Sequence, residues 1–262
     1  MSTATAPARG RIGIMSALPQ ELAAVLALMP DEHRTTVAGR DFWPGHLAGH
    51  EVVAVVSGIG KVAAATTATL LLQRFGVEGI VFTGVAGGLG DGVRVGDAVV
   101  ATTLLQHDMD ASPLFPRHEM PGYGLSRFVP DAHWQQGLSA AARRTLASLD
   151  ALLIPQAIRE FGLHSPRLHT GLIISGDRFV ATSAESTALR QQLPDALAVE
   201  MEGAAVAQVC HDHRAPFAAV RTISDRADDA AHVDFVRFVT DVASHYSAHT
   251  VLDWLQHLPP PG

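Results

Sequence analysis

Two spacings of apolar residues alternate along the chain, and this alternation predicts alternating strands and helices. Short apolar runs of strand length come before stretches whose apolar residues recur every three or four positions. The run 11–16 is the first of the strand type. Pro19 then suits the first turn of a helix, where the N–H that proline lacks would have no partner. The apolar positions that follow share one helical face: Leu22, Val25, Leu26 and Met29.

The same two spacings continue to the end of the chain. Strands are predicted over 11–16, 42–47, 52–57, 79–83, 97–105, 168–175, 197–199 and 217–223. Helices are predicted over 19–29, 61–75, 132–149, 154–162, 182–192, 202–211 and 233–256. Alternation of this kind predicts an α/β fold with one three-layer αβα domain, in which helices flank both faces of a mixed central β-sheet. We expect this single domain to span 11–257, with 1–10 and 258–262 as flexible termini.

Proline and glycine interrupt both patterns between 107 and 130. This segment carries Pro113, Pro116, Pro121 and Pro130, together with Gly122 and Gly124. A loop of this length inside a compact domain usually serves a function. We therefore expect an irregular functional loop there.

Composition and charge narrow the class of partner. The chain has 262 residues, a net charge of -7 and 17% charged residues. An acidic protein lacks the cationic face that nucleic acids and anionic membranes attract, so we expect neither as a partner. Cys210 is the one cysteine, which excludes an intramolecular disulfide. The chain has no apolar run of spanning length, and 1–10 lacks the apolar stretch of a signal peptide, so we expect a cytoplasmic protein.

The sequence does not support dinucleotide binding, a metal site or a reactive cysteine. The segment 58–63 matches the dinucleotide fingerprint G-x-G-x-x-A, but no carboxylate follows the next predicted strand, where the ribose would need one. We interpret it as a tight turn between strand and helix. His107, Asp108 and Asp110 are polar residues that open the long loop, and we expect no metal or cofactor. Cys210 has no basic neighbour in sequence and is expected to be a buried, unreactive side chain.

Carboxylates stand just past several predicted strands. Glu21 follows the first strand, Glu200 and Glu202 follow a later one, and Asp225 follows the strongest core strand. Each alone could be an acid favoured by a helix N-terminus. Ligands of open α/β sheets bind at the carboxyl ends of strands, however, so the set together predicts a site at that edge.

Glycines and an aromatic residue suggest the shape of the ligand. Predicted turns at 58–60 and 84–90 would leave the backbone bare for a flat molecule, and Phe179 would offer a face for stacking. Few basic residues accompany these turns. The pattern favours an uncharged nucleoside over a phosphate.

Seven segments, in order from about residue 11 to 225, carry a family resemblance. The chain resembles the 5'-methylthioadenosine/S-adenosylhomocysteine nucleosidases of the nucleoside phosphorylase/nucleosidase superfamily. The matching segments are Ile12-Gly13-Ile14 with Glu21, the runs 57–62, 83–89, 107–110 and 175–179, Val199-Glu200-Met201-Glu202, and Ile223-Ser224-Asp225.

The resemblance implies a nucleoside phosphorylase-like fold and a hydrolase that cleaves the N-glycosidic bond of 5'-substituted adenosines. The products would be adenine and a 5-substituted ribose. Asp225 would protonate N7 of adenine, and Glu21 would deprotonate the attacking water. Such reactions pass through an oxocarbenium-like transition state. Glu202 would bind the ribose hydroxyls and stabilise the developing positive charge.

The resemblance also implies a set of substrate-binding residues. Phe179 would stack on adenine, the Val180 backbone would read the base edge, and Met201 would pack against the ribose. Ser224 would position Asp225. The full implied set is Ile59, Gly87, Phe179, Val180, Glu200, Met201, Glu202 and Ser224.

Two segments depart from the family pattern. Val85 replaces a serine that many relatives carry, and 112–121 differs from the commonest form. In relatives this loop borders the partner's pocket, so the resemblance implies a homodimer with the 111–121 loop near the partner's active site. The preferred 5'-group stays open among methylthio, homocysteinyl, deoxy and aminodeoxyfutalosine substrates.

Two alternatives remain beside hydrolysis. A nucleoside phosphorylase on the same fold would need cations for its phosphate, and Glu21 would repel that anion. A non-catalytic nucleoside-binding module would need the aromatic face but not Glu21 together with Asp225.

Overall fold

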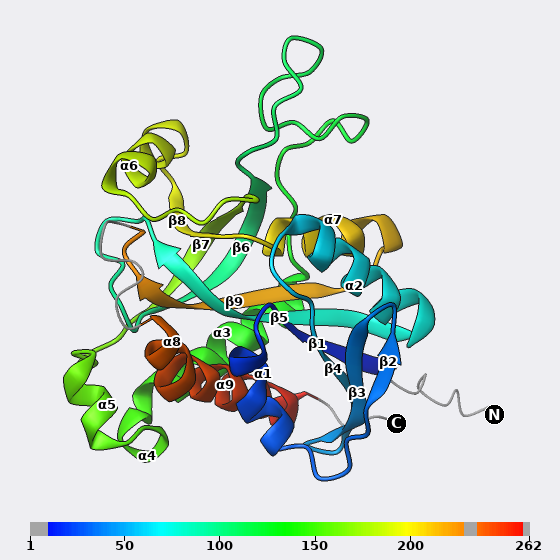
Figure 1. Ribbon diagram of the computed structural model, residues 1–262, viewed down its shortest axis with the longest axis vertical. Coiled ribbons are helices and arrows are strands. Elements are labelled where there is room, and N and C mark those ends of the chain that lie inside the picture. The colour runs from blue at the N-terminus through cyan, green and yellow to red at the C-terminus, as the bar shows by residue number, and fades with distance from the viewer. Residues whose placement is uncertain (1–9, 228–234, 259–262) are drawn as a thin grey trace, which may run out of the picture.

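A nine-stranded β-sheet runs through the molecule, and helices cover both of its faces (Figure 1). The computed structural model describes residues 10–227 and 235–258. The strands are β1 Arg11–Ser16, β2 Thr35–Val37, β3 Arg40–Leu47, β4 His50–Val56, β5 Val77–Gly88, β6 Ala98–Gln106, β7 Leu168–Ser175, β8 Ala196–Glu200 and β9 Phe217–Asp225. The helices are α1 Pro19–Ala27, α2 Lys61–Arg74, α3 Ala132–Ala147, α4 Leu149–Leu152, α5 Pro155–Glu160, α6 Ser183–Gln192, α7 Gly203–His213, α8 Phe235–Phe238 and α9 Ser244–His257, with a π-helical turn, Val239–Ala243, between the last two.

The strand pairings close part of the sheet on itself. The strands follow the order β2-β3-β4-β1-β5-β8-β7-β6-β9, and β9 pairs back onto β5. Strands β5, β8, β7, β6 and β9 therefore form a strand circuit, from which β1, β4, β3 and β2 extend as an open arm. Pairing is parallel between β1 and β5 and antiparallel between β5 and β8, so the predicted α/β fold with a mixed sheet is confirmed.

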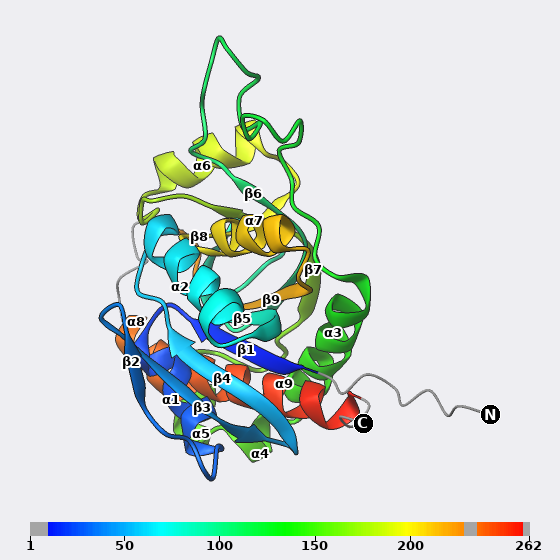
Figure 2. The ribbon, with the colours of Figure 1, turned by 90° about the vertical axis from the view of Figure 1, so that its right-hand side faces the viewer.

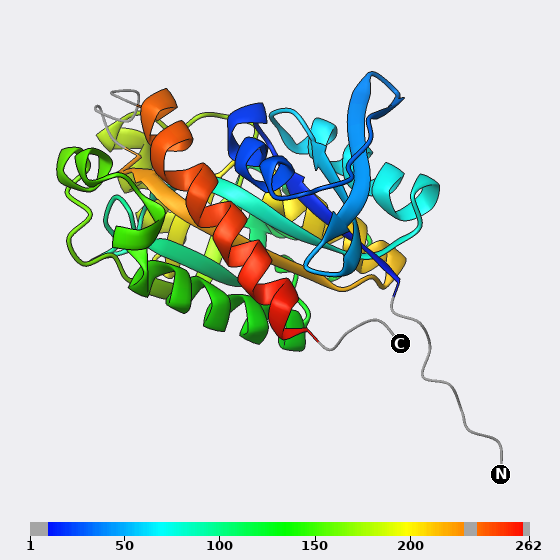
Figure 3. The ribbon, with the colours of Figure 1, turned by 90° about the horizontal axis from the view of Figure 1, so that it is seen from below.

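Each face of the sheet has its own apolar core. Successive side chains of a strand point to opposite faces, so Ile12 and Ile14 of β1 pack on one side and Met15 on the other. Helices α1, α3 and α9 cover the first side (Figure 3). On this side the ring centroids of Trp134 and Trp254 lie 5.0 Å apart. Helices α2 and α7 lie together on the second side (Figure 2). Burial on both sides explains the nearly continuous apolar runs in the sequence.

Several predicted element boundaries were wrong. The segment 84–90 was predicted as a glycine turn, but β5 continues through it to Gly88. Strand β9 extends past the predicted end and includes Asp225. The last helix was predicted as continuous over 233–256, but a π-helical turn interrupts it, and residues 233–234 lie outside the described residues. The short strand β2 was not predicted.

Strand direction brings the predicted site residues to one edge. Strands β1, β5 and β9 are parallel, so their carboxyl ends meet. Strand β8 enters beside β5 with Val199 opposite Gly87, which places Glu200 at the same edge. The predicted termini at 1–9 and 259–262 lie outside the described residues.

The segment between β6 and α3 is irregular, as predicted. It projects beyond the sheet at the top of Figure 1, and its backbone bridges are confined to Leu104 with Phe128 and Met120 with Leu125 among the described residues. Leu114 in this loop is 84% exposed. Among the described residues, no helix is both long enough and apolar enough to span a membrane.

Candidate active site

A cavity of about 170 Å³ opens at the edge where these strands end. All ten residues predicted for catalysis or binding lie in its lining: Glu21, Ile59, Gly87, Phe179, Val180, Glu200, Met201, Glu202, Ser224 and Asp225. Seven further lining residues were not predicted: Ala17, Leu18, Val85, Ala86, Arg178, Val199 and Phe235. The roles of the ten residues remain predictions.

Backbone donors fix the Glu21 carboxylate at the start of α1. One oxygen accepts hydrogen bonds from the N–H groups of Ala17 and Leu18, at 2.9 and 2.8 Å, and the other accepts one from Val85 at 2.9 Å. The side chain is almost fully buried, and this burial raises the pKa of Glu21, although Arg221 and the three N–H groups partly oppose the shift. A carboxylate with a raised pKa is suited to accept a proton near neutral pH.

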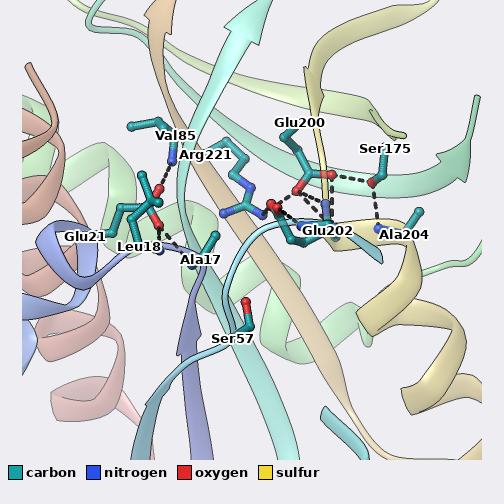
Figure 4. Close-up of polar contacts among 12 residues, drawn as sticks. Ala17, Leu18, Glu21, Ser57, Val85, Ser175, Glu200, Glu202, Ala204 and Arg221 are labelled. Atoms are coloured by element: carbon teal, nitrogen blue, oxygen red, sulfur yellow. Dashed lines mark hydrogen bonds and ion pairs between the residues drawn. The ribbon is translucent and has the colours of Figure 1, made fainter. Parts of the chain in front are cut away.

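Arg221 of β9 is the main residue that the sequence analysis missed. Its side chain is 1% exposed, and its guanidinium lies 2.5 Å from an oxygen of Glu200 and 3.9 Å from one of Glu202 (Figure 4). The guanidinium also stacks over the ring of Phe82, at 3.8 Å from the centroid. A buried charge needs partners, so an arginine inside the apolar run 217–223 was the available signal.

Glu200 holds together three parts of the site from inside the protein. Its carboxylate accepts hydrogen bonds from Arg221, from the Ser175 hydroxyl, and from the N–H groups of Glu202 and Gly203 at the start of α7 (Figure 4). These bonds satisfy N–H groups that a helix start leaves open. Contact of Glu200 with substrate stays a prediction.

Glu202 lies beside this network and is also almost fully buried. One of its oxygens accepts a hydrogen bond from the Gly60 N–H at 2.8 Å. Burial and the nearby Glu200 carboxylate raise the pKa of Glu202 to about 8, although Arg221 acts in the opposite direction. A cation forming next to this carboxyl would favour its ionised form.

The Asp225 carboxyl is held at the end of β9. The Ser224 hydroxyl donates to one oxygen at 2.6 Å, and the Ala227 N–H donates to the other at 2.7 Å. Gly87 lies opposite, where a Cβ atom would come within 2.9 Å of the Ala227 Cβ and 3.1 Å of an Asp225 oxygen. Glycine at 87 thus leaves the space that the Asp225 carboxyl occupies.

The glycines of β5 serve a different purpose from the one predicted. A Cβ at Gly84 would lie 2.5 Å from a Glu21 oxygen and 2.6 Å from an Arg221 nitrogen. The predicted bare turn was wrong: these glycines belong to a strand, and at 84 and 87 they make room for charged side chains of the protein itself.

Apolar side chains form the mouth of the cavity. Phe179 is 48% exposed, and its ring meets that of Phe235 edge to face at 6.2 Å. Ile59 is 59% exposed. Among the described lining residues, Arg178 alone carries a positive charge, and its guanidinium pairs with Glu185. Because Phe179 is half exposed at the mouth of the cavity, its ring is available to stack on a base.

Two of the acidic residues near the start of the long loop bond to other residues of the protein. Asp108 pairs with Lys61, and Asp110 bonds to Ser112. The described residues contain no group of three side chains arranged to hold a metal ion. Cys210 is buried, as predicted, and burial raises the pKa of its thiol.

Comparisons with known proteins agree on one family. A family model described as the phosphorylase superfamily matches residues 11–255. The 5'-methylthioadenosine/S-adenosylhomocysteine nucleosidase of Shewanella pealeana is 36% identical over 95% of this chain and 100% of its own. The Neisseria meningitidis nucleosidase of the same name, solved with methylthio-immucillin-A, has a TM-score of 0.83 at 32% identity, over 95% of this chain and all of its own. Futalosine hydrolase of Helicobacter pylori has a TM-score of 0.79 at 31% identity, over 95% of this chain and 98% of its own.

Proposed function

Since the chain belongs to the phosphorylase superfamily, we propose that it hydrolyses 5'-methylthioadenosine and S-adenosylhomocysteine. It is an N-glycosyl hydrolase that cleaves adenosine derivatives to adenine and a substituted ribose. The observation that carries this conclusion is one cavity that combines four buried carboxyl groups with an exposed aromatic face.

The proposed reaction needs two proton transfers. The oxygen of a water molecule bonds to C1' of the ribose while the bond from C1' to N9 of adenine breaks. Glu21 takes a proton from the water, and Asp225 gives a proton to N7, so that adenine leaves without a negative charge. General acid and base groups of this kind contribute about 10²–10⁴-fold each.

The geometry of the two groups supports these roles. Glu21 is held rigidly by three N–H groups and has a raised pKa, as a base requires. The Asp225 carboxyl is oriented by Ser224 and Ala227. Glu202 lies in the same cavity lining and would bind the ribose hydroxyls. Positive charge on the sugar would then favour its ionised form.

Phosphorolysis is the disfavoured alternative. Phosphate would need free cations in the cavity, but Arg178 pairs with Glu185 and the buried Arg221 pairs with Glu200. The buried carboxylate of Glu21 would also repel the anion.

Two classes of 5'-group on the adenosine substrate have solved relatives of this chain. The solved relatives include a nucleosidase with a methylthio inhibitor and a futalosine hydrolase, at nearly equal identity. The identity values therefore do not separate the two classes of 5'-group.

The long loop is the segment through which we expect two copies of the chain to associate. We propose a cytoplasmic homodimer in which each 111–121 loop lies near the partner's active site. Support comes from the projection of this loop beyond the sheet (Figure 1) and from the exposure of the Leu114 side chain. We also propose that 11–257 form one domain, which the continuous nine-stranded sheet supports.

One assay tests the reaction. The protein is incubated with methylthioadenosine, with and without phosphate, and free adenine and the sugar product are followed. We expect adenine release at the same rate in both conditions and a sugar without phosphate. A phosphorylated sugar would support the phosphorylase, and binding without release would support the non-catalytic module.

A further inference from the structure

Helix α2 begins without a capping side chain of its own. Its N-cap residue is Gly60, which makes no side-chain hydrogen bond and has a φ of 96°. The first N–H groups of a helix need acceptors, and the helix dipole favours negative charge there. Two distant carboxylates supply it: Glu202 accepts from the Gly60 N–H at 2.8 Å, and Asp177 accepts from the Lys61 N–H at 2.7 Å.

Lys61, Asp108 and Asp177 close a cycle of hydrogen bonds. The Lys61 N–H donates to the Asp177 carboxylate, and the Asp177 N–H donates to the Asp108 carboxylate at 2.9 Å. The Lys61 ammonium then donates to the other Asp108 oxygen at 2.6 Å and to Gln106 at 3.1 Å. Each of the three residues thus bonds to both of the others, and we call the cycle the clasp.

The clasp is partly shielded from water. The side chains of Lys61 and Asp108 are 16% and 33% exposed. Burial alone would raise the pKa of Asp108, but the Lys61 ammonium and the Asp177 N–H outweigh it and lower that pKa. An ion pair that is hydrogen-bonded and partly buried is held more firmly than an exposed pair.

The clasp joins three segments that are far apart in the sequence. Lys61 begins α2, Asp108 begins the long loop after β6, and Asp177 follows β7. Ile59 lies two residues before Lys61, and Phe179 lies two residues after Asp177. Both side chains line the cavity. The hydrogen bond from the Lys61 N–H to the Asp177 carboxylate therefore joins the segment that carries Ile59 to the segment that carries Phe179.

We propose that Lys61, Asp108 and Asp177 are positioning residues, which set the separation of Ile59 and Phe179 and so the fit of the nucleoside. The clasp touches neither of the proposed proton-transfer groups. It acts on binding of the substrate through the two walls. This inference rests on the proposed function, because it concerns the same cavity.

The variants Lys61→Met, Asp108→Asn and their combination test the clasp. Each keeps a side chain of similar size and removes a charge. We expect KM for methylthioadenosine to rise about 10-fold in each single variant, with kcat within about 3-fold of the wild type and an unchanged pH profile of kcat. The double variant should resemble the single ones, because contacting residues are not additive.

A matched control is Asp195→Asn, which breaks an Asp–Arg pair with Arg127 outside the cavity lining. It should leave KM unchanged. Thermal unfolding of every variant separates general loss of structure from an effect on the cavity. A KM within 2-fold of the wild type, a loss in kcat as large as the rise in KM, additive effects in the double variant, or the same change in the control would overturn the proposal.

Equilibrium binding of adenine, measured by calorimetry, separates this inference from the proposed function. Binding of the base needs no hydrolysis. A wild type that binds adenine but releases none from methylthioadenosine would contradict the proposed function. In that case a roughly 10-fold weaker binding of adenine by Asp108→Asn would still support the clasp, and equal binding would overturn it.

Discussion

Buried charged residues of this site bond to the protein itself as well as face the cavity. Glu21 accepts three backbone N–H groups, and Glu200 holds Arg221 and the start of α7. Such bonds compensate the cost of burying a charge and leave each group in one orientation. Orientation fixed before the substrate arrives is what proton transfer requires.

Replacement of either proposed proton-transfer group should nearly abolish adenine release. Asp225→Asn removes the acid, and its amide oxygen can still accept the hydrogen bond of the Ala227 N–H. Glu21→Gln removes the base, and its amide oxygen can still accept from the N–H groups of Ala17 and Leu18, while the hydrogen bond from Val85 is lost. We expect kcat to fall by about 10²–10⁴-fold in each. Adenine release and circular dichroism of both variants check this, and near-normal turnover with a native spectrum would contradict the assigned roles.

The raised pKa of Glu202 predicts a dependence of stability on pH. A carboxyl whose pKa rises on folding, here to about 8 from 4.5, is favoured in its protonated form in the native state. Its contribution is fully present below about pH 4.5 and is lost as pH rises through about 8. The free energy of unfolding of the wild type, relative to Glu202→Gln, should therefore fall by up to about 5 kcal/mol across that range.

Urea unfolding of both proteins at several pH values measures this difference. Wild-type and variant curves that stay parallel with pH would show that Glu202 has an ordinary pKa in the folded protein.

Strand β5 shapes the site through its glycines and through its pairings with three other strands. Gly84 leaves space for Glu21 and Arg221, and three residues later Gly87 leaves space for Asp225. The strand also pairs with β1, β9 and β8, so it fixes the relative positions of the elements that carry those carboxylates.

The variant Gly84→Ala should therefore disturb the site more than the fold. Its Cβ would overlap the Glu21 carboxylate and the Arg221 guanidinium. We expect a loss of about 1–3 kcal/mol in stability, typical of overpacking, and a fall of about 10²-fold in adenine release. Gly92→Ala is the control: φ there is +81° and the space is open, so it should lose stability through backbone strain but keep its activity. Equal activity of the two variants would contradict the close approach.

Periodicity predicted most elements because their apolar residues are buried on defined faces. It failed at Thr35–Val37, a three-residue strand at the open edge whose side chains are not fully buried. It failed at 84–88 because glycines usually mark turns, and the reason for them, charged side chains from α1 and β9, is visible only in three dimensions. Arg221 was missed likewise: its partners Glu200 and Glu202 are distant in sequence and adjacent only in the fold.

At the scale of the whole molecule, the projecting loop predicts self-association. The variant Leu114→Asp places a charge on a side chain that is 84% exposed, and it should lower the mass in solution from twice the 27.7 kDa chain toward one chain. Ile154→Asp, at a residue 61% exposed near α5, is the control and should leave the mass unchanged. Light scattering at micromolar concentration reads both, and a monomeric wild type would contradict the proposed dimer.

The strand circuit of β5, β8, β7, β6 and β9 has a consequence for how the native protein fluctuates. Strands in a closed arrangement cannot separate at one pairing without straining the others, so sub-global opening of this part is costly. Backbone amides in the middle of β5 should consequently exchange with heavy water only in the rare, most unfolded states. Motions that admit a substrate and release adenine are therefore expected in segments outside the circuit.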